Sequence, residues 1–135
     1  MLQFDPSVRE AIVGHAHEGA PAEVCGVLGG SHGEAESVAT TSRRAENVAP
    51  TPRTRYELDP AEQLRLMDAI EERGDDVVGF YHSHPAGPAE PSETDAAQAT
   101  WEGYSYVVVD LSGEPAVGSW RWTGAGFEPE EVAVA

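Results

Sequence analysis

Two stretches of the chain repeat apolar residues at helical spacing, and both open with an Asp-Pro pair. The first runs from Asp5-Pro6 to Gly19 and the second from Asp59-Pro60 to Gly74. Aspartate is a favourable N-cap, proline suits the first helical position and glycine suits a helix end. Glu62 also stands at the third helical position of the second stretch, which predicts a capping box. The pattern therefore predicts two helices.

Shorter apolar runs bounded by turn residues predict strands between and after these helices. Residues 23–28 and 35–41 predict a β-hairpin, and residues 92–101 have helical composition. The other predicted strands span 77–81, 104–111 and 116–123. The resulting order, α-β-β-α-β-α-β-β, predicts an α/β fold with a central sheet flanked by helices. At 135 residues, we expect a single domain over 1–135.

The charge balance narrows the classes of partner that we expect the protein to bind. The chain has 24 acidic residues against 8 basic ones, a formal net charge of −16, and every basic residue is arginine. Such a charge repels nucleic acid and anionic membranes, so we expect neither as a partner. Because molar salt screens this repulsion within about 3 Å, the composition favours a halophile's cytoplasm. An acidic mesophilic protein from a GC-rich genome is the alternative interpretation.

Composition also limits the cellular compartment and the kinds of disulfide or metal site that we expect. No stretch approaches the roughly 18 apolar residues of a membrane span, and the first residues lack a signal-peptide pattern, which favours the cytoplasm. A single cysteine, Cys25, excludes an internal disulfide and any zinc site built from paired CxxC motifs. A metal site in this chain must therefore use histidine and carboxylate ligands.

Candidate ligands follow the apolar run at 77–81. His82 and His84 are two residues apart, so on a strand they share one face, and Pro85 ends the strand beside them. Ser92 and Asp95 come after a short proline-rich loop and share one face of the predicted helix. Two histidines and one carboxylate leave a fourth tetrahedral position of Zn²⁺ open, which is the pattern of a catalytic zinc site.

Hydrolysis at such a site also needs a general base, and the chain has no HExxH motif. Glu90 and Glu93 lie in a loop and at a helix start, where carboxylates are normally solvated. Glu23, directly before a tight apolar run, is a further candidate for the base, although taken alone it has the position of a solvated acid before a strand.

Taken together, these motifs resemble the JAMM/MPN+ metalloprotease family. The resemblance rests on Glu23-Val-Cys-Gly-Val-Leu-Gly-Gly30, on His82-Ser-His84-Pro85 and on Ser92-Glu-Thr-Asp95, and it covers nearly the whole chain. It implies a cytidine-deaminase-like α/β sandwich and a zinc isopeptidase. It further implies that His82, His84 and Asp95 bind zinc, that Glu23 is general base and acid, and that Ser92 stabilises the oxyanion.

The acidic, lysine-free and short chain is most similar to the small haloarchaeal members of that family. The resemblance implies that its partners are ubiquitin-like β-grasp modifier proteins and their conjugates, cut after the modifier's C-terminal tail. One alternative is a sulfur-transfer peptidase of the same family, which releases cysteine or a small amine from a carrier protein's tail. Another is a non-catalytic MPN scaffold. A zinc nucleoside deaminase needs PCxxC, which one cysteine cannot supply.

Several of these residues also have ordinary structural interpretations. Ser92 and Asp95 have the spacing of a near capping box, a role that competes with metal binding for Asp95. Cys25 is expected to be a small buried thiol. The second histidine pair, His15 and His17, lies on a predicted helix, where residues two apart diverge, so we expect both on the surface.

Two further groups of residues allow more than one interpretation. Trp120 and Trp122 share one strand face and are expected in the core or in a dimer contact, and the oligomeric state is otherwise undetermined. Half of the positive charges, Arg43, Arg44, Arg53 and Arg55, fall within thirteen residues. One interpretation is that these arginines pair with nearby acidic side chains. The other is that the cluster attracts an acidic modifier protein, with Arg53, Arg55 and Tyr56 as substrate-binding residues.

Overall fold

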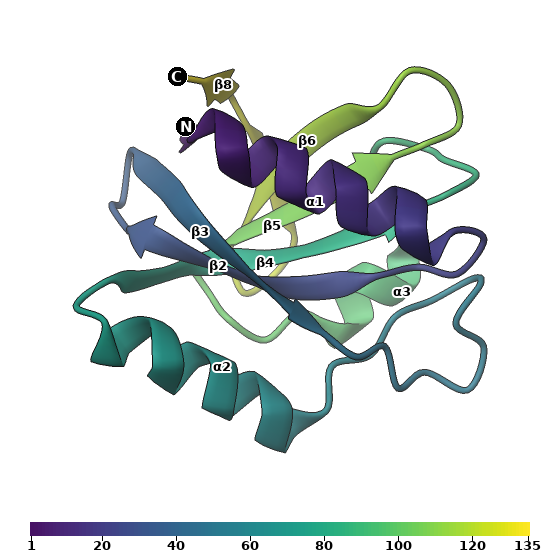
Figure 1. Cartoon of the computed structure of the whole chain (residues 1–135), viewed down its shortest axis with the longest axis horizontal. Helices are drawn as coiled ribbons and strands as arrows, with labels where there is room; N and C mark the ends of the chain where they lie inside the picture. The colour runs from purple at the N-terminus through teal and green to yellow at the C-terminus, as the bar shows by residue number, and fades with distance from the viewer.

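The computed structural model describes residues 1–135, and its strands form one mixed sheet with three helices around it (Figure 1). The sheet order is β7-β6-β5-β4-β2-β3-β1-β8, in which β4 pairs with β5, and β1 with β3 and β8, in parallel. The elements are β1 (Leu2–Phe4), α1 (Pro6–Gly19), β2 (Cys25–Ser31), β3 (Ser37–Ala45), α2 (Pro60–Glu72), β4 (Asp76–His84), α3 (Glu93–Gln98), β5 (Ser105–Asp110), β6 (Ala116–Trp122), β7 (Phe127–Glu130) and β8 (Val132–Val134).

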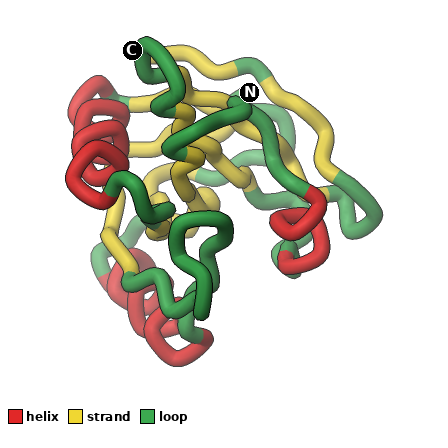
Figure 2. The backbone as a smooth tube through the Cα atoms, turned by 90° about the vertical axis from the view of Figure 1, so that its right-hand side faces the viewer, coloured by secondary structure: helices red, strands yellow, loops and turns green.

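The helices cover both faces of the sheet, as the sequence predicts for an α/β fold. Figure 1 shows α1 across one face and α2 along the opposite one, and Figure 2 shows α3 on the other side of the view from α1 and α2. No helix has both the length and the apolar content that crossing a membrane requires. The arrangement leaves the carboxyl end of β4 facing α3, which is where the candidate ligands lie.

Two apolar clusters hold the layers together. Val8, Ile12 and Ala16 of α1 are almost fully buried against β1, β2, β4 and β5. On the other face, Met67 and Ile70 of α2 pack on a cluster that includes Phe80 of β4. Because each fully buried aliphatic or aromatic side chain contributes roughly 1.5–3 kcal/mol, these contacts fix both helices on the sheet that carries the site.

The helix starts follow the Asp-Pro signals closely. The Asp5 carboxylate accepts a hydrogen bond from the Ser7 backbone N–H, and the Asp59 carboxylate accepts one from that of Glu62. The capping box expected from Glu62 is wrong, because its Oε1 accepts the backbone N–H of Glu46, at 2.8 Å. The Glu62 side chain therefore anchors the end of β3 to α2 and does not cap its own helix.

Other boundaries differ from the predictions. α3 ends at Gln98, earlier than expected, because Ala99 is extended and the backbone N–H groups of Thr100 and Trp101 donate to the Tyr106 hydroxyl. The short strands β1, β7 and β8 were not predicted, since three or four residues carry little periodic signal. The predicted strands at 104–111 and 116–123 do pair, antiparallel, as β5 and β6.

A buried ion pair holds β6 and β7 together with their surroundings. Glu130 and Arg121 pair at 2.9 Å, with side chains 5 % and 14 % exposed. The hydroxyls of Ser105 and Ser119 donate to the second oxygen of Glu130. The Arg121 guanidinium also donates to the Gly33 carbonyl and to Ser37, which lie 88 and 84 residues away in sequence. We call this group the Glu130–Arg121 cluster.

Candidate metal centre and active site

The two candidate histidines lie at the carboxyl end of a central strand. His82 and His84 are the last alternate residues of β4 and are 2 % and 6 % exposed. His82 is opposite Cys25 of β2 on one side and Val108 of β5 on the other, so neighbouring strands hold it on both sides. The strand ends before Pro85, as predicted. Both imidazoles therefore stand on one face at a fixed strand end.

Asp95 meets these histidines from α3. Its Oδ2 lies 3.0 Å from Nε2 of His82 and 3.2 Å from Nε2 of His84, and the two nitrogens are 3.1 Å apart. Ligands about 2.0 Å from a tetrahedral zinc ion are about 3.3 Å from one another, so the three atoms have nearly the spacing that such an ion requires. The three predicted ligands thus converge.

The capping role expected to compete for Asp95 coexists with this arrangement. The Ser92 hydroxyl accepts the backbone N–H of Asp95, and Oδ2 of Asp95 accepts that of Ser92, so the capping box is complete. The same Oδ2 atom faces both histidines. The helix cap therefore orients the carboxylate toward the ligand cluster, and the two roles support each other.

Each imidazole makes one further contact that fixes its orientation. Nδ1 of His84 lies 2.8 Å from the Pro88 carbonyl oxygen, which can only accept, so Nδ1 carries a proton and Nε2 is the nitrogen that can bind a metal ion when the imidazole is neutral. Tyr56 stacks on His82, with ring centroids 4.2 Å apart and planes inclined by 20°. Each imidazole is thus held in the orientation that directs Nε2 toward Asp95.

Glu23 completes the group from the residue pair that precedes β2. One ligand atom from each of Glu23, His82, His84 and Asp95 lies within 4.8 Å of the others, and all four side chains are buried. Glu23 Oε1 is buried without a hydrogen-bond partner. A buried, unpaired carboxylate oxygen beside two imidazoles is unusual in a purely structural role, and it is available to a bound water.

Ser83, between the two histidines, ties Glu23 to them. Its hydroxyl accepts the backbone N–H of Val24 at 2.9 Å, and its own N–H donates to the Val24 carbonyl at 3.1 Å. Ser83 faces away from the ligands, as the strand alternation predicts, and is fully buried. A hydroxyl that bonds to main chain leaves no spacing pattern, so the sequence does not reveal this role of Ser83.

The electrostatics of the group favour a cation among these residues. Burial alone would raise the pKa of Asp95, but its hydrogen bonds to His82 and His84 outweigh burial and hold that pKa well below its usual range. Burial lowers the pKa of His82. For His84, the contacts with Asp95 and the Pro88 carbonyl outweigh burial and raise the pKa. The surroundings of His84 therefore stabilise a positive charge, which a metal ion would supply.

The carboxyl of Glu23 is tuned differently. Burial raises its pKa to about 7, with His84 opposing the rise and Asp95 adding to it. A carboxyl with a pKa near neutrality exchanges protons readily at physiological pH, which suits a general base and acid. Two carboxyls in one site with pKa values moved in opposite directions indicate two different roles.

An open cleft of about 280 Å³ leads to this group. It is lined by Glu23, His84 and Ser92 together with Arg53, Thr54 and the loop at 85–88. Ser92 is exposed, and since its oxygen accepts from Asp95, its hydroxyl hydrogen is free to donate into the cleft. The structure therefore brings the predicted residues Ser92 and Arg53 to the edge of the His-His-Asp-Glu group.

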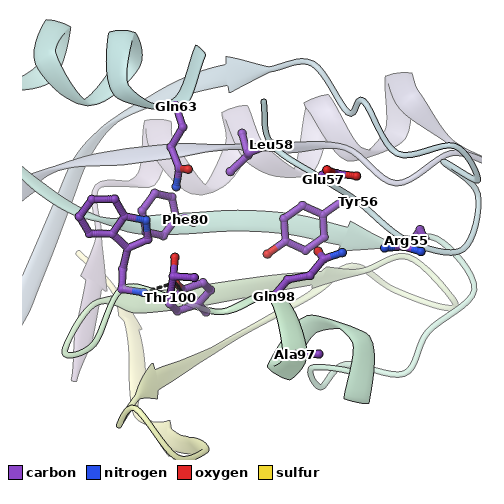
Figure 3. A pocket seen from close by; sticks show the side chains of 11 residues that line it. Arg55, Tyr56, Glu57, Leu58, Gln63, Phe80, Ala97, Gln98 and Thr100 are labelled. Carbon is purple, nitrogen blue, oxygen red and sulfur yellow. Dashed lines mark hydrogen bonds between the residues drawn. The ribbon is translucent and has the colours of Figure 1, made fainter. Parts of the chain in front are cut away.

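Arg55 and Tyr56 line a neighbouring pocket of about 420 Å³ (Figure 3). Figure 3 shows Gln98 beside the Tyr56 ring, with Leu58 and Gln63 pointing in from above. Trp101, Phe80 and Tyr106 add an aromatic wall. Because Tyr56 lies between this pocket and His82, the pocket begins directly beside the ligand cluster.

The remaining sequence expectations have mixed outcomes. Cys25 is fully buried, and burial raises the pKa of its thiol to about 12, as expected for an inert residue. His17 is exposed as expected, but the surface position expected for His15 is wrong, since His15 is half-buried with Nδ1 2.7 Å from the Tyr81 hydroxyl. Trp122 packs against Phe127 beside the α2 core. Arg44 pairs with Glu18, which favours local pairing for that arginine.

The chain is also similar to a family model and to known proteins. The family model described as prokaryotic homologs of the JAB domain matches residues 5–123. The chain is 45% identical over 137 residues to the desampylase of Haloferax volcanii, covering 98% of this chain and 96% of that protein. It is 39% identical over 104 residues to the CysO-cysteine peptidase of Mycobacterium tuberculosis, covering 73% and 66%.

The fold has solved counterparts as well. The crystal structure of a JAB1/MPN domain protein from Archaeoglobus fulgidus matches with a TM-score of 0.66 at 20% identity, over 99% of this chain and 97% of that one. At this identity the likeness concerns the fold alone, and it confirms the MPN sandwich expected from the sequence. With its family model, its relatives and its buried His-His-Asp-Glu group in agreement, the chain belongs to the prokaryotic JAB-domain family of JAMM peptidases.

Proposed function

We propose that this protein is a cytoplasmic, zinc-dependent isopeptidase that cuts the peptide or isopeptide bond after the C-terminal tail of a ubiquitin-like modifier. The observation that carries the proposal is the buried convergence of His82, His84 and Asp95 beside the unpaired carboxylate oxygen of Glu23. The similarity to a desampylase over 98% of the chain supports the substrate class. In this reaction the amide C–N bond breaks, and water supplies a hydroxyl to the carbonyl carbon and a proton to the leaving amine.

His82, His84 and Asp95 are the proposed zinc ligands. Two imidazole nitrogens and one carboxylate oxygen are the donor set of many catalytic zinc sites, and their mutual distances of 3.0–3.2 Å suit tetrahedral binding. Zinc held there would activate a water molecule and polarise the scissile carbonyl. The Pro88 carbonyl and Tyr56 keep the two imidazoles aimed at the ion.

Glu23 is the proposed general base and then general acid. Its Oε1 has no partner within the protein, so it can accept a proton from the attacking water and hand the proton to the leaving nitrogen. Its pKa of about 7 suits both transfers. A lysine side chain and a main-chain nitrogen are both amine leaving groups for this transfer, so the chemistry covers isopeptides and linear fusions.

Ser92 is the proposed oxyanion donor. Its oxygen accepts the Asp95 N–H, which leaves the hydroxyl hydrogen to donate toward a carbonyl oxygen in the cleft. Loss of one such donor typically lowers kcat by about 10²–10³.

The cleft and the adjoining aromatic pocket together suit a substrate in which an extended tail leads away from a folded protein. We propose that the modifier tail lies along the aromatic pocket lined by Arg55 and Tyr56, and that Arg53 and Arg55 attract an acidic modifier. A sulfur-transfer peptidase is the second candidate, favoured by the 39% identity to a CysO-cysteine peptidase. It would use the same catalytic groups but release a free amino acid.

The test is incubation of candidate modifier conjugates in high salt with the wild type, with Glu23→Ala, and with the wild type plus a chelator. We expect cleavage by the wild type alone, and recovery of the chelated enzyme when zinc is added back. The product masses separate a released protein from a released amino acid. Equal cleavage by Glu23→Ala would refute the role of Glu23, and a scaffold would cleave nothing in any arm.

A further inference from the structure

Asn47, the only asparagine in the chain, lies at the base of the segment that joins β3 to α2. This segment, residues 46–59, carries Arg53 into the cleft and Tyr56 onto His82. A single β-bridge between Asn47 and Leu58 closes its two ends. Beyond that bridge the segment has no regular ladder but only scattered main-chain hydrogen bonds, so side-chain contacts contribute to its shape.

The Asn47 side-chain amide makes four hydrogen bonds, the full number that two donor hydrogens and two acceptor lone pairs allow. Nδ2 donates to the carbonyl oxygens of Glu23, at 2.9 Å, and Arg55, at 3.1 Å. Oδ1 accepts the backbone N–H groups of Ala49, at 3.0 Å, and Glu57, at 3.1 Å. The donor half thus joins the segment to Glu23, whereas the acceptor half shapes the segment itself.

Glu23 has a second tie to the same segment. Its backbone N–H donates to the Pro52 carbonyl at 2.7 Å, so both polar backbone groups of Glu23 bind residues 46–59. The neighbouring residue, Val24, is bound to Ser83 of β4. The main chain at Glu23 therefore bridges the strand that carries the histidines and the segment that lines the cleft.

We propose that Asn47 is a positioning residue that holds Glu23 and the substrate-side segment in one fixed arrangement. The proposal rests on the function proposed above, since it assigns Asn47 an effect on the base and on substrate binding. Asn47 neither lines the cleft nor contributes an atom to the ligand cluster. It acts through the backbone of Glu23 and Arg55.

Asn47→Asp isolates the donor half of the amide. A carboxylate keeps the side chain's shape and its acceptor for Ala49 and Glu57, but places an oxygen against the carbonyls of Glu23 and Arg55. Gln3→Glu is the matched control, because it makes the same amide-to-carboxylate change on β1, away from the site. Asn47→Ser, which keeps one donor on a smaller side chain, is the second variant if Asn47→Asp fails to fold.

The experiment compares kcat and KM on a modifier conjugate, zinc affinity by chelator competition, and backbone amide exchange of the metal-free proteins, all in molar salt. For Asn47→Asp we expect kcat to fall about 10–100-fold, zinc affinity to fall by a clearly smaller factor than kcat, and exchange to accelerate at Glu23 and across residues 51–57. Gln3→Glu should match the wild type in every measurement. The same criteria apply to Asn47→Ser.

A kcat within threefold of wild type would overturn the proposal, as would unchanged exchange at Glu23. A parallel loss of zinc affinity would also overturn it, because the effect would then pass through the ligands. Glu23→Ala, measured alongside, separates the two hypotheses. If Glu23→Ala is fully active, the proposed function fails; if it is inactive while Asn47→Asp cleaves normally, only the role of Asn47 fails.

Discussion

The ring of Tyr56 lies flat against the imidazole of His82, at a centroid distance of 4.2 Å, and is itself only 6 % exposed. This contact limits rotation of the imidazole about its own bonds. We therefore expect Tyr56→Ala to weaken zinc binding by about 10–100-fold, as loss of an outer contact to a metal ligand typically does. Tyr56→Phe keeps the stacked ring and should bind zinc like the wild type. Competition with a chromogenic chelator measures both, and equal affinities for Tyr56→Ala and wild type would contradict the prediction.

Glu23 should make the metal-free protein less stable as pH rises. In the unfolded chain this carboxyl ionises near its ordinary pKa of 4.5, whereas in the folded chain it stays protonated up to about 7. The free energy of unfolding therefore falls between these two values, by on the order of 1–3 kcal/mol. Glu23→Gln removes this loss, so the variant should be more stable than wild type at pH 8 and equal to it at pH 4. Denaturant titration of chelator-treated proteins at both pH values is the measurement, and a constant difference across pH would refute it.

The Glu130–Arg121 cluster should affect the stability of the fold and leave the catalytic rate unchanged. Glu130→Ala leaves the Arg121 guanidinium buried without its partner, and breaking such a pair typically costs about 3–5 kcal/mol. Burial would raise the pKa of Glu130, but hydrogen bonds from Ser105, Arg121 and Ser119 outweigh it and lower that pKa. Stabilisation by Glu130 is therefore present at neutral pH and lost as the pH falls below about 4.5. Thermal unfolding measured from pH 7 down to pH 2 should show a large difference between wild type and variant at pH 7 that shrinks progressively below about 4.5, with unchanged kcat in the folded fraction.

Folding should depend on salt. Among the 24 acidic side chains, only Glu18, Glu62 and Glu130 pair with an arginine or with the terminal amine. The rest of the acidic surface is unpaired, so self-repulsion must be screened by ions. We expect Tm to rise steeply between about 0.1 M and 2 M KCl, with unfolding at the lowest salt. A flat dependence would instead support the GC-rich mesophile interpretation of the composition.

Arg53 and Arg55 should discriminate between substrates by size. Arg53 is exposed in the cleft, and Arg55 lines the adjoining pocket. Replacing both with glutamine should raise KM for an acidic modifier conjugate and leave a short peptide substrate unaffected, because only the protein presents an extended charged surface. Arg65→Gln, on the exposed side of α2, is the matched control. Equal effects on both substrates would remove the steering role.

The sequence predicts the fold class and most of its elements, and it also predicts that His82, His84 and Asp95 come together. The strand period places His82 and His84 together, and the short loop and helix bring back Asp95, so local rules were sufficient for three of the four residues. Glu23 was placed mainly by family resemblance, because it lies 59 positions before His82 and only the pairing of β2 with β4 brings the two together.

What the sequence could not predict depends on contacts with main chain. Asn47 binds carbonyl and N–H groups, which every residue has, so no spacing between residue types marks its role. Glu62 has a perfect capping position, yet the Glu46 N–H competes successfully for its carboxylate. Of the short strands, β1 pairs with the longer β3, β7 pairs with the longer β6, and β8 pairs with β1 at the edge of the sheet, so their formation is a tertiary effect.

The two hydrogen bonds between Ser83 and Val24 have a consequence for how activity can be regulated. They join the main chain next to Glu23 to the strand that carries the two imidazoles, and this strand pairs with β2 in the middle of the sheet, so separating the two strands would require breaking the central ladder of the domain. Opening of central strands requires a free energy that approaches that of complete unfolding. We therefore expect regulation of this enzyme to act on which proteins reach the cleft, because β2 and β4 stay paired in the folded protein.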